Sequence, residues 1–260
     1  MSALLQVEAL SKTFGAVAAV HNLSFQIEPG EVVGIIGPNG AGKTTAVNLI
    51  SGVLRPSKGR VCFGGEDVTG LRPDRLVRRG LVRTFQATTV YSTRIVRENV
   101  RRGSFRTRYP GFLHALLETP KQRAWRAESE KHVDRILSWF GLSGHQDTQA
   151  AALPYGFQKT LGMAIALAAE PKLILLDEPA AGLSAEEADH VRDTIVRIRE
   201  SGVTVVVIDH NMRFISNLCD RIVVMHHGEE LAAGTPREVL TDPRVIEAYL
   251  GKRHVVAQVG

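Results

Sequence analysis

Residues 37–44, Gly-Pro-Asn-Gly-Ala-Gly-Lys-Thr, are the stretch of this chain whose residue types and spacing imply chemistry most clearly. The spacing G-x-x-x-x-G-K-T is typical of a loop whose successive backbone N–H groups point inward and surround phosphate oxygens. A helix that starts at such a loop adds the partial positive charge of its N-terminus. Gly40 and Gly42 let the backbone approach the phosphates without a Cβ in the way. The stretch therefore predicts a phosphate-binding loop.

The side chains that close this loop carry the predicted contacts. Lys43 can reach the β- and γ-phosphates of a nucleotide, and the Thr44 hydroxyl is placed to hold Mg²⁺. The alternative is a glycine-rich turn that caps a core helix. The residues of this stretch that we predict to bind the nucleotide are Gly37, Pro38, Asn39, Gly40, Ala41, Gly42, Lys43, Thr44 and Thr45.

Two adjacent carboxylates, Asp177 and Glu178, directly follow the apolar run 173–176. An aspartate at the end of a strand can hold Mg²⁺ through water beside a phosphate loop. The next carboxylate can polarise an attacking water. The alternative, two acids that open an exposed loop, is the weaker interpretation in a chain that also has a phosphate loop.

Three further side chains are candidates with weaker signals. Gln86 ends a predicted strand and could touch Mg²⁺ or the attacking water. His210 follows a buried strand and could contact the γ-phosphate, although a histidine there is more often a partly exposed turn residue. Phe14 could stack on an adenine ring, although a loop aromatic is more often packed against its neighbours.

The elements that must position these residues alternate between strands and helices. The β-branched run 32–36 predicts a buried strand before the loop, and 44–54 predicts a helix with Val47, Ile50 and Leu54 on one face. Buried strands separated by helices imply a parallel sheet with helices packed on it. The other predicted strands are 5–10, 17–27, 60–63, 81–85, 173–176 and 203–208, with two short ones around 227–228; the other predicted helices are 73–79, 122–140, 158–167 and 185–200, with two more near Pro236 and Pro243.

Length and composition are those of an ordinary globular protein. The 260 residues give room for one large domain or two small ones, and 44% apolar with 23% charged residues is a usual balance. We see no apolar run long enough to cross a bilayer and no signal-peptide pattern at the start, so we expect a soluble, cytosolic chain. Cys62 and Cys219 suggest neither a disulfide framework nor a metal site.

The net charge of +5 is a weak indication of a partner. It suits a protein that works near anionic lipid or nucleic acid, and it suits equally a basic solvated surface. Arginines cluster in 72–83 and 101–108, but aromatic residues do not alternate with them as a stacking surface for nucleic acid requires. We therefore expect no nucleic-acid partner.

The motifs taken together resemble one family. Residues 37–44, Gln86, 177–178, 181–184 and His210, in this order and spacing, are similar to the ATP-binding cassette (ABC) family over essentially the whole chain. The resemblance implies an α/β P-loop NTPase of the ABC type, with a mainly parallel core sheet, an antiparallel β subdomain and a helical subdomain. It implies one ABC ATPase domain over 1–260, in which 1–87 and 168–235 form the nucleotide-binding lobe, 88–167 the helical signature lobe and 236–260 a C-terminal helical extension.

The resemblance also implies roles for individual residues. The cofactors would be ATP and Mg²⁺, and two such domains would sandwich two ATP molecules head to tail, each between one domain's phosphate loop and the other's signature sequence. Residues 181–185 would form the loop that contacts the partner. The implied catalytic residues are Lys43, Gln86, Glu178 as the base and His210 as the switch histidine; Phe14 would stack on adenine, and the Mg²⁺ ligands would be Thr44, Gln86 and Asp177, partly through water.

The signature sequence is where the chain departs from the family pattern. The family usually has Leu-Ser-Gly-Gly-Gln, whereas residues 153–158 are Leu-Pro-Tyr-Gly-Phe-Gln. Pro154 stands at the serine position and brings neither a hydroxyl nor an N–H to a phosphate. Tyr155 replaces the first glycine, and only Gly156 of the central trio is kept. Ile165 stands where an arginine often follows the signature, so we expect phosphate recognition by this edge to differ from the family's.

A narrower resemblance lies in residues 112–120, 177–183, 234–236 and 248–251, which look like those of the ATP-binding subunits of branched-chain amino-acid importers. Such importers pair two ATP-binding subunits with two membrane permease subunits and a periplasmic binding protein. The resemblance implies an ATPase that converts ATP to ADP and phosphate to drive uptake of branched-chain or other hydrophobic amino acids or related small solutes. It would lie at the cytoplasmic face of the membrane, held by the permease subunits, beside a second ATPase subunit that is a different chain or a copy of this one.

Two alternatives stay open from the sequence. One is a cytosolic ABC ATPase of DNA repair or cofactor assembly, but repair members usually carry a long coiled-coil insertion and no sustained heptads occur here. The other is a regulatory nucleotide-binding partner with little hydrolysis of its own. The altered signature favours that second alternative, whereas Lys43, Asp177 and Glu178 argue against it.

Overall fold

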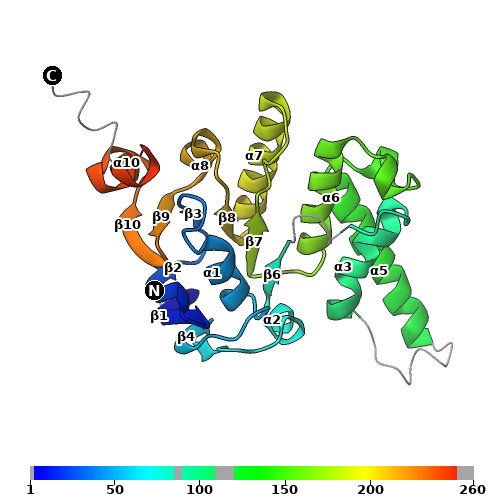
Figure 1. Ribbon diagram of the computed structural model, residues 1–260. Helices are drawn as coiled ribbons and strands as arrows, with labels where there is room; N and C mark the ends of the chain where they lie inside the picture. Colours follow the sequence, from blue (N-terminus) through cyan, green and yellow to red (C-terminus); the bar gives the residue numbers. More distant parts are fainter. Residues whose placement is uncertain (1–2, 85–89, 109–119, 251–260) are drawn as a thin grey trace.

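Six strands form the larger of two sheets in the computed structural model, which describes residues 3–84, 90–108 and 120–250 (Figure 1). Their order is β10-β9-β3-β8-β7-β6. Neighbouring strands from β9 to β6 pair in parallel, and β10 pairs antiparallel with β9 at the edge. The strands are β3 (Val32–Ile36), β6 (Leu81–Arg83), β7 (Leu173–Asp177), β8 (Thr204–Ile208), β9 (Arg221–His226) and β10 (Glu229–Gly234).

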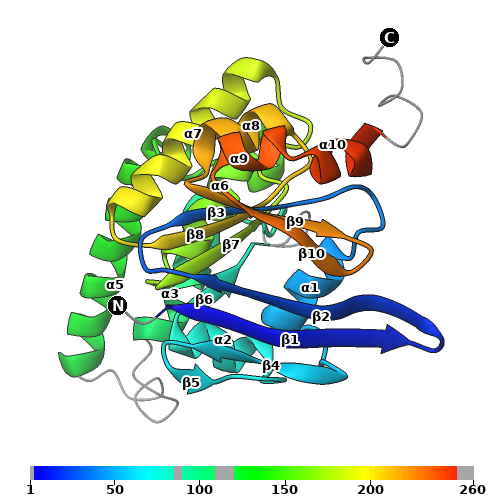
Figure 2. The same ribbon diagram turned by 90° about the vertical axis from the view of Figure 1, so that its left-hand side faces the viewer.

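The smaller sheet is antiparallel and has the order β2-β1-β4-β5. Helix α1 (Lys43–Ile50) lies between the two sheets (Figure 2). One hydrophobic core joins the three layers, because Val33 of β3, Val47 of α1 and Leu5 of β1 all belong to it. The strands are β1 (Leu5–Phe14), β2 (Val17–Ile27), β4 (Lys58–Phe63) and β5 (Glu66–Asp67).

Helices cover the opposite face of the larger sheet (Figure 2). Val32 and Ile36 of β3 pack in a second core with Val191, Ile215 and Val239 of three of these helices. Every residue of β3 is buried, because the strand is covered on both faces, and this explains its unbroken apolar run. The helices on this side of the sheet are α7 (Ala185–Glu200), α8 (Met212–Leu218), α9 (Pro236–Thr241) and α10 (Pro243–Leu250).

Three helices stand together at the opposite end of the molecule from α10 (Figure 1). They are α3 (Val96–Arg108), α5 (Pro120–Trp139) and α6 (Tyr155–Leu167), with short 3-10 turns at Ser143–His145 and Ala150–Ala152 between α5 and α6. Arg97 of α3 donates to Glu130 of α5 at 2.7 Å, and Val133 of α5 is buried in the second core. The proposed boundaries between lobes, at residues 87, 167 and 235, stay a prediction.

The predicted fold class is confirmed: the protein has an α/β fold with a mainly parallel core sheet, a separate antiparallel sheet and a group of helices. The predicted strands 17–27 and 32–36 have the observed bounds. The same holds for two helices, α2 (Pro73–Arg79) and α7. These elements are bounded by strong local signals, such as Gly80, which ends α2 with φ 97°.

Two predicted helix boundaries are wrong. Helix α1 ends at Ile50 rather than Leu54, because Gly52 takes a positive φ of 73° and the Leu54 N–H turns back to the carbonyl of Asn48 at 2.9 Å. Helix α6 begins at Tyr155 rather than at residue 158. Pro154 occupies the position before the helix with φ −52°, a value its ring favours, so the helix can start directly after it.

Strand β1 continues to Phe14 instead of ending at residue 10, and α5 covers Pro120–Trp139 where 122–140 was predicted. Strand β6 covers Leu81–Arg83, and Phe85, its predicted end, lies outside the described residues. The two-residue strand β5 was not predicted. As predicted, the cysteines are unbonded: Cys62 is half-buried and Cys219 is buried. In the described part of the chain, none of the helices combines the length and apolar character that crossing a membrane requires.

Candidate functional site

The loop between β3 and α1 has a backbone that side chains would disrupt. Gly42 has φ 95°, and a Cβ there would lie 2.3 Å from the carbonyl oxygen of Ala19 in β2. Gly37 has φ 154°, and a Cβ there would lie 2.1 Å from the carbonyl oxygen of Met225. Gly40 also has a positive φ, but the space beside it is open. Gly37 and Gly42 are thus needed for the close approach of the loop to neighbouring strands. Gly40 faces open space.

The start of α1 is arranged to receive an anion. Gly42 precedes the helix and has no side chain to cap it, so the first N–H groups of α1 have no side-chain acceptor at this position and can bind an anion. The Lys43 Nζ donates to the carbonyls of Gly37 at 2.6 Å and Pro38 at 3.0 Å, across the mouth of the loop. Burial lowers the pKa of Lys43 from its ordinary value, and the negative charge of Glu178 opposes this shift.

A hollow in front of the loop brings together four separate segments. Residues 39–45 form its floor, Val17, Ala18 and Ala19 of β2 form one wall, and Glu178 and His227 complete it. Sequence reasoning missed His227, which follows β9 with φ 48° and whose ring contacts His226 at 4.0 Å between centroids. The turn between two short strands was predicted, but nothing in the sequence said that it would lie beside the loop.

The parallel sheet places the two predicted polar strand ends side by side. Asp177 pairs with Ile208 in the register of β7 and β8, and the Glu178 N–H donates to the Ile208 carbonyl at 2.7 Å. Glu178 has φ 46°, in the left-handed region that residues with a Cβ rarely adopt. Its Oε1 lies 3.8 Å from Nδ1 of His210. The structure therefore brings the proposed base and the proposed switch histidine together.

Asp209 connects the segments that follow the two strands, and sequence reasoning did not assign it a role. Its side chain is 1% exposed. Its Oδ2 accepts from the N–H of Ala180 at 3.2 Å, and its Oδ1 accepts from the N–H of Asn211 at 2.9 Å. Because one buried carboxylate holds both segments, the positions of Glu178 and His210 depend on each other.

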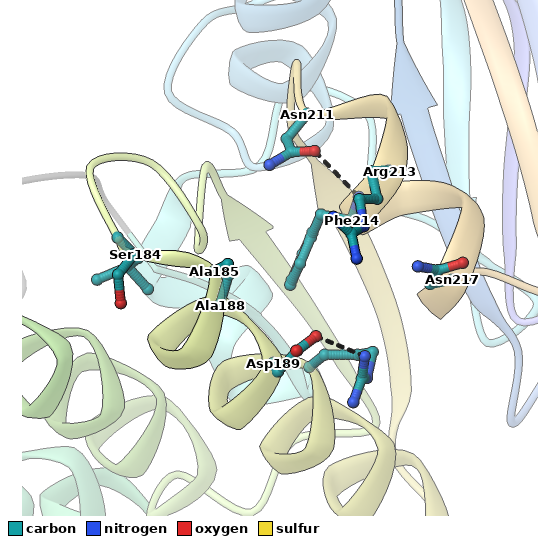
Figure 3. Close-up of a pocket in the computed structure, with 10 residues that line it drawn as sticks. Ser184, Ala185, Ala188, Asp189, Asn211, Arg213, Phe214 and Asn217 are labelled. Carbon is teal, nitrogen blue, oxygen red and sulfur yellow. Dashed lines mark hydrogen bonds and ion pairs between the residues drawn. The ribbon is translucent and has the colours of Figure 1, made fainter.

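A second hollow lies between the starts of α7 and α8 (Figure 3). Ser184 and Asn211 cap these two helices, each accepting from a backbone N–H three residues on. Phe214 points between the helices, and Asp189 pairs with Arg192 at 2.6 Å (Figure 3). These side chains fix the two helix starts, so we interpret this hollow as part of the framework behind the site.

The comparisons with known proteins decide the family. Residues 20–181 match the family described as ABC transporter, and residues 229–255 match the one described as Branched-chain amino acid ATP-binding cassette transporter. The chain belongs to the ABC transporter family. The predicted resemblance is therefore confirmed, and so is its narrower form.

Individual ABC proteins are similar along nearly their full length. The chain is 38% identical over 253 residues to the high-affinity branched-chain amino acid transport ATP-binding protein LivG of Escherichia coli, covering 96% of this chain and 98% of LivG. It is 36% identical over 250 residues to the corresponding protein BraF of Pseudomonas aeruginosa, with the same coverage. A lipopolysaccharide export ATP-binding protein, LptB of Acidithiobacillus ferridurans, is 35% identical over 251 residues, with 96% and 98% covered.

Solved structures give the same family. A crystal structure of an ATP-binding cassette of an ABC transporter in its ADP conformation has a TM-score of 0.83 and 32% identity, covering 97% of this chain and all of the other. ATP-binding cassettes of known structure thus share this fold with the present chain.

The ABC signature region makes contacts within its own chain. The Tyr155 ring packs on Gly182, where an added Cβ would lie 3.2 Å from the tyrosine Cε1. Lys159, one turn further along α6, donates from Nζ to the carbonyl of Glu178 at 3.0 Å. Sequence reasoning treated the signature only as a surface for a partner, whereas here α6 also supports the backbone of Glu178.

The remaining predicted residues are placed less directly. Phe14 ends β1 with 49% exposure, and Lys12 lies 5.3 Å above its ring. Asp177 is the last residue of β7, and its Oδ2 accepts from Nη2 of Arg83 at 2.7 Å. Gln86 lies outside the described residues, so its predicted role as a metal and water ligand stays a prediction. The predicted roles of Lys43, Thr44, Glu178 and His210 likewise await experiment.

Proposed function

We propose that this chain is the ATP-hydrolysing subunit of an ABC importer for branched-chain or other hydrophobic amino acids or related small solutes. The observation that carries the proposal is the hollow in front of residues 39–45, whose wall includes Glu178. A carboxylate that lines a hollow beside an anion-binding loop can orient and deprotonate a water that attacks a phosphate. The match of residues 229–255 to the branched-chain amino acid transporters, and the higher identity to LivG and BraF than to the lipopolysaccharide export protein, support amino acids as the class of solute.

The chain's own residues account for binding and positioning. The loop N–H groups and Lys43 hold the β- and γ-phosphates, and Phe14 stacks on the adenine ring. Glu178 takes the proton of the attacking water, while His210 beside it contacts the γ-phosphate and keeps the carboxylate oriented. Catalysis then comes mainly from positioning and from stabilising charge.

The residues present also fit Mg²⁺. The Thr44 hydroxyl on the first turn of α1, the Asp177 carboxylate at the end of β7 and the amide of Gln86 are oxygen ligands, which this hard cation prefers. When bound with ATP, Mg²⁺ would neutralise charge that develops on the phosphates during transfer.

The proposed assembly has two ATPase subunits, two membrane permease subunits and, outside the membrane, a periplasmic binding protein. The chain would lie at the cytoplasmic face, attached to the permease subunits by the part of its helical lobe between residues 88 and 120. The second ATPase subunit would be a different chain or a copy of this one. In a head-to-tail pair, the signature would face the partner's phosphate loop, and residues 181–185 would contact the partner.

The test is coexpression of the chain with candidate permease and ATPase subunits encoded beside it. We expect the subunits to copurify from membranes and to hydrolyse ATP faster when the binding protein and its amino acid are added. A complex that forms but hydrolyses ATP at the same rate with Lys43→Ala would contradict the proposal. The chain expressed alone should stay off protein-free lipid vesicles at physiological salt; tight vesicle binding would contradict attachment through permeases.

A further inference from the structure

Arg83, the last residue of β6, is a charged side chain that lies deep in the protein beside the phosphate loop. Its side chain is 6% exposed. It donates from Nη2 to Oδ2 of Asp177 at 2.7 Å, and from Nη1 to Oδ1 of Asn48 at 2.6 Å and to Oγ of Ser51 at 3.1 Å. One guanidinium thus joins the ends of two strands and the helix that follows the phosphate loop.

The helix residues that Arg83 contacts form a stripe with the proposed metal ligand. Thr44, Asn48 and Ser51 are spaced four and three residues apart, so they lie on one face of α1. The guanidinium binds the second and third members of the stripe, and its other end binds Asp177. The first member of the stripe is therefore held in a fixed relation to Asp177.

We propose that Arg83 is a positioning residue for the magnesium pair, Thr44 and Asp177. It sets the distance between the α1 stripe and the end of β7, and it fixes the rotation of the Asp177 carboxylate by taking Oδ2. The oxygen left to face a metal-bound water is then Oδ1. This inference rests on the proposed ATP hydrolysis, and it adds a residue to that site.

A planar guanidinium suits this task better than another cation. It presents several N–H donors in a rigid plane, so two neighbouring nitrogens can bind partners on two elements at once. A lysine would bring a single charge on a flexible stem. If Arg83 only filled space, an apolar residue of similar length would serve as well, because a buried ion pair is often no more stabilising than packed hydrocarbon.

The experiment measures metal binding directly, with Mn²⁺ as the probe and Glu178→Gln as the background in which ATP is not turned over. Mn²⁺ affinity of the ATP-loaded protein is read by electron paramagnetic resonance, and ATP affinity is measured separately in EDTA. We expect Arg83→Met to weaken Mn²⁺ binding at least fivefold while ATP affinity in EDTA changes less than twofold. Arg83→Lys should weaken Mn²⁺ binding less than Arg83→Met does.

The matched control is Arg79→Met, which removes an exposed arginine at the end of α2 that pairs with Glu66 of β5. It should leave both affinities within twofold. If Arg83→Met fails to fold, Asn48→Ala is the second variant. It removes one acceptor of Arg83 and leaves the Arg83–Asp177 ion pair in place, and it should also weaken Mn²⁺ binding.

Three results would overturn the inference. Unchanged Mn²⁺ affinity in Arg83→Met would leave Arg83 a structural residue, and tighter Mn²⁺ binding would mean that it only opposes the metal's charge. If Arg83→Met lost ATP affinity equally in Mn²⁺ and in EDTA, Arg83 would support the whole phosphate loop and not the metal ligands in particular. Failure of the background protein itself to bind ATP would instead contradict the proposed function, and the inference with it.

Discussion

At the scale of single residues, Glu178 carries the chemistry. Glu178→Gln keeps the size and packing of the side chain but cannot take a proton, so we expect ATP binding to persist while turnover falls about a hundred- to ten-thousand-fold. Nucleotide affinity and steady-state hydrolysis of the assembled complex check this. Turnover near that of the unmodified complex would remove Glu178 from the role of base.

Lys43 should behave differently, because its charge acts on the bound phosphates before any chemistry. Lys43→Ala removes a hydrogen bond between charged groups, worth about 1.5–3 kcal/mol, so ATP affinity should fall roughly ten- to a hundredfold. Equilibrium binding of a fluorescent ATP analogue measures the loss. Unchanged affinity would mean that the lysine does not reach the phosphates.

Cys219 gives a prediction about stability and pH. Burial raises the pKa of its thiol from 9.0 to about 12 in the folded protein. Between these values the unfolded chain releases the thiol proton and the folded chain keeps it, so the free energy of unfolding should fall as pH rises above 9.0, by up to about 1.4 kcal/mol per pH unit from this group. Cys219→Ala should make the fall less steep between pH 9 and 11 in denaturant titrations. An identical slope in both proteins would contradict this burial effect.

Sequence reasoning found the residues that follow a general pattern and missed those that depend on three-dimensional neighbours. Lys43 and Glu178 could be predicted because one belongs to the phosphate-loop spacing and the other follows a predicted strand. Arg83 and Asp209 are not, since each acts by holding segments far apart in the chain. A charged residue at a strand end gives no sign in the sequence of being buried.

At the scale of elements, α7 shows a local signal that both predicted and stabilises structure. Ser184 accepts from the N–H of Glu187, whose carboxylate accepts from the N–H of Ser184, which completes a capping box. Ser184→Ala should lower the free energy of unfolding by about 0.5–2 kcal/mol. Urea unfolding of the purified chain measures it, and Ser92→Ala in an exposed turn is the surface control. A change no larger than that of the control would show that the cap contributes little.

Helices α1 and α6 show why the boundaries of elements were harder to predict than their existence. The apolar spacing of α1 continues to Leu54, but Gly52 ends the helix early. Helix α6 starts at Tyr155, directly after Pro154, whose ring favours the φ of −52° found there, although the predicted helix began at residue 158. Periodicity therefore predicts that an element exists, and the backbone conformation of single residues beside it decides where it begins or ends.

At the scale of the whole molecule, the altered signature predicts two unequal nucleotide sites. In a head-to-tail pair with a different chain, the ATP on this chain's loop is completed by the partner's signature, whereas the partner's ATP meets Pro154 and Tyr155. That second site loses a serine hydroxyl, a contact worth on the order of 1.5–3 kcal/mol, although Gly156 and the start of α6 offer backbone N–H groups in part compensation. We expect hydrolysis mainly on this chain's loop.

The unequal sites are tested by disabling each one in the assembled pair. Glu178→Gln here should reduce ATP hydrolysis far more than the matching change in the partner, and Pro154→Ser should raise hydrolysis at the partner's site. Equal losses from the two single changes, with no effect of Pro154→Ser, would show that the departure from the family signature has no functional consequence.

The architecture was predictable at this scale because the order of strands, loop and helices follows a family pattern along the whole chain. The packing of the smaller sheet against α1 and the support of Glu178 by Lys159 were not, because they join separate segments of the chain without any local signature.

The central claim, that ATP hydrolysis on this chain drives solute uptake, is tested most directly by transport in proteoliposomes. The assembled complex is reconstituted with the binding protein, and entry of labelled leucine is followed with ATP on the side that faces the ATPase subunits. We predict uptake that requires ATP, stops with Glu178→Gln and persists with Arg79→Met. Uptake that continues at the same rate with Glu178→Gln would contradict the account.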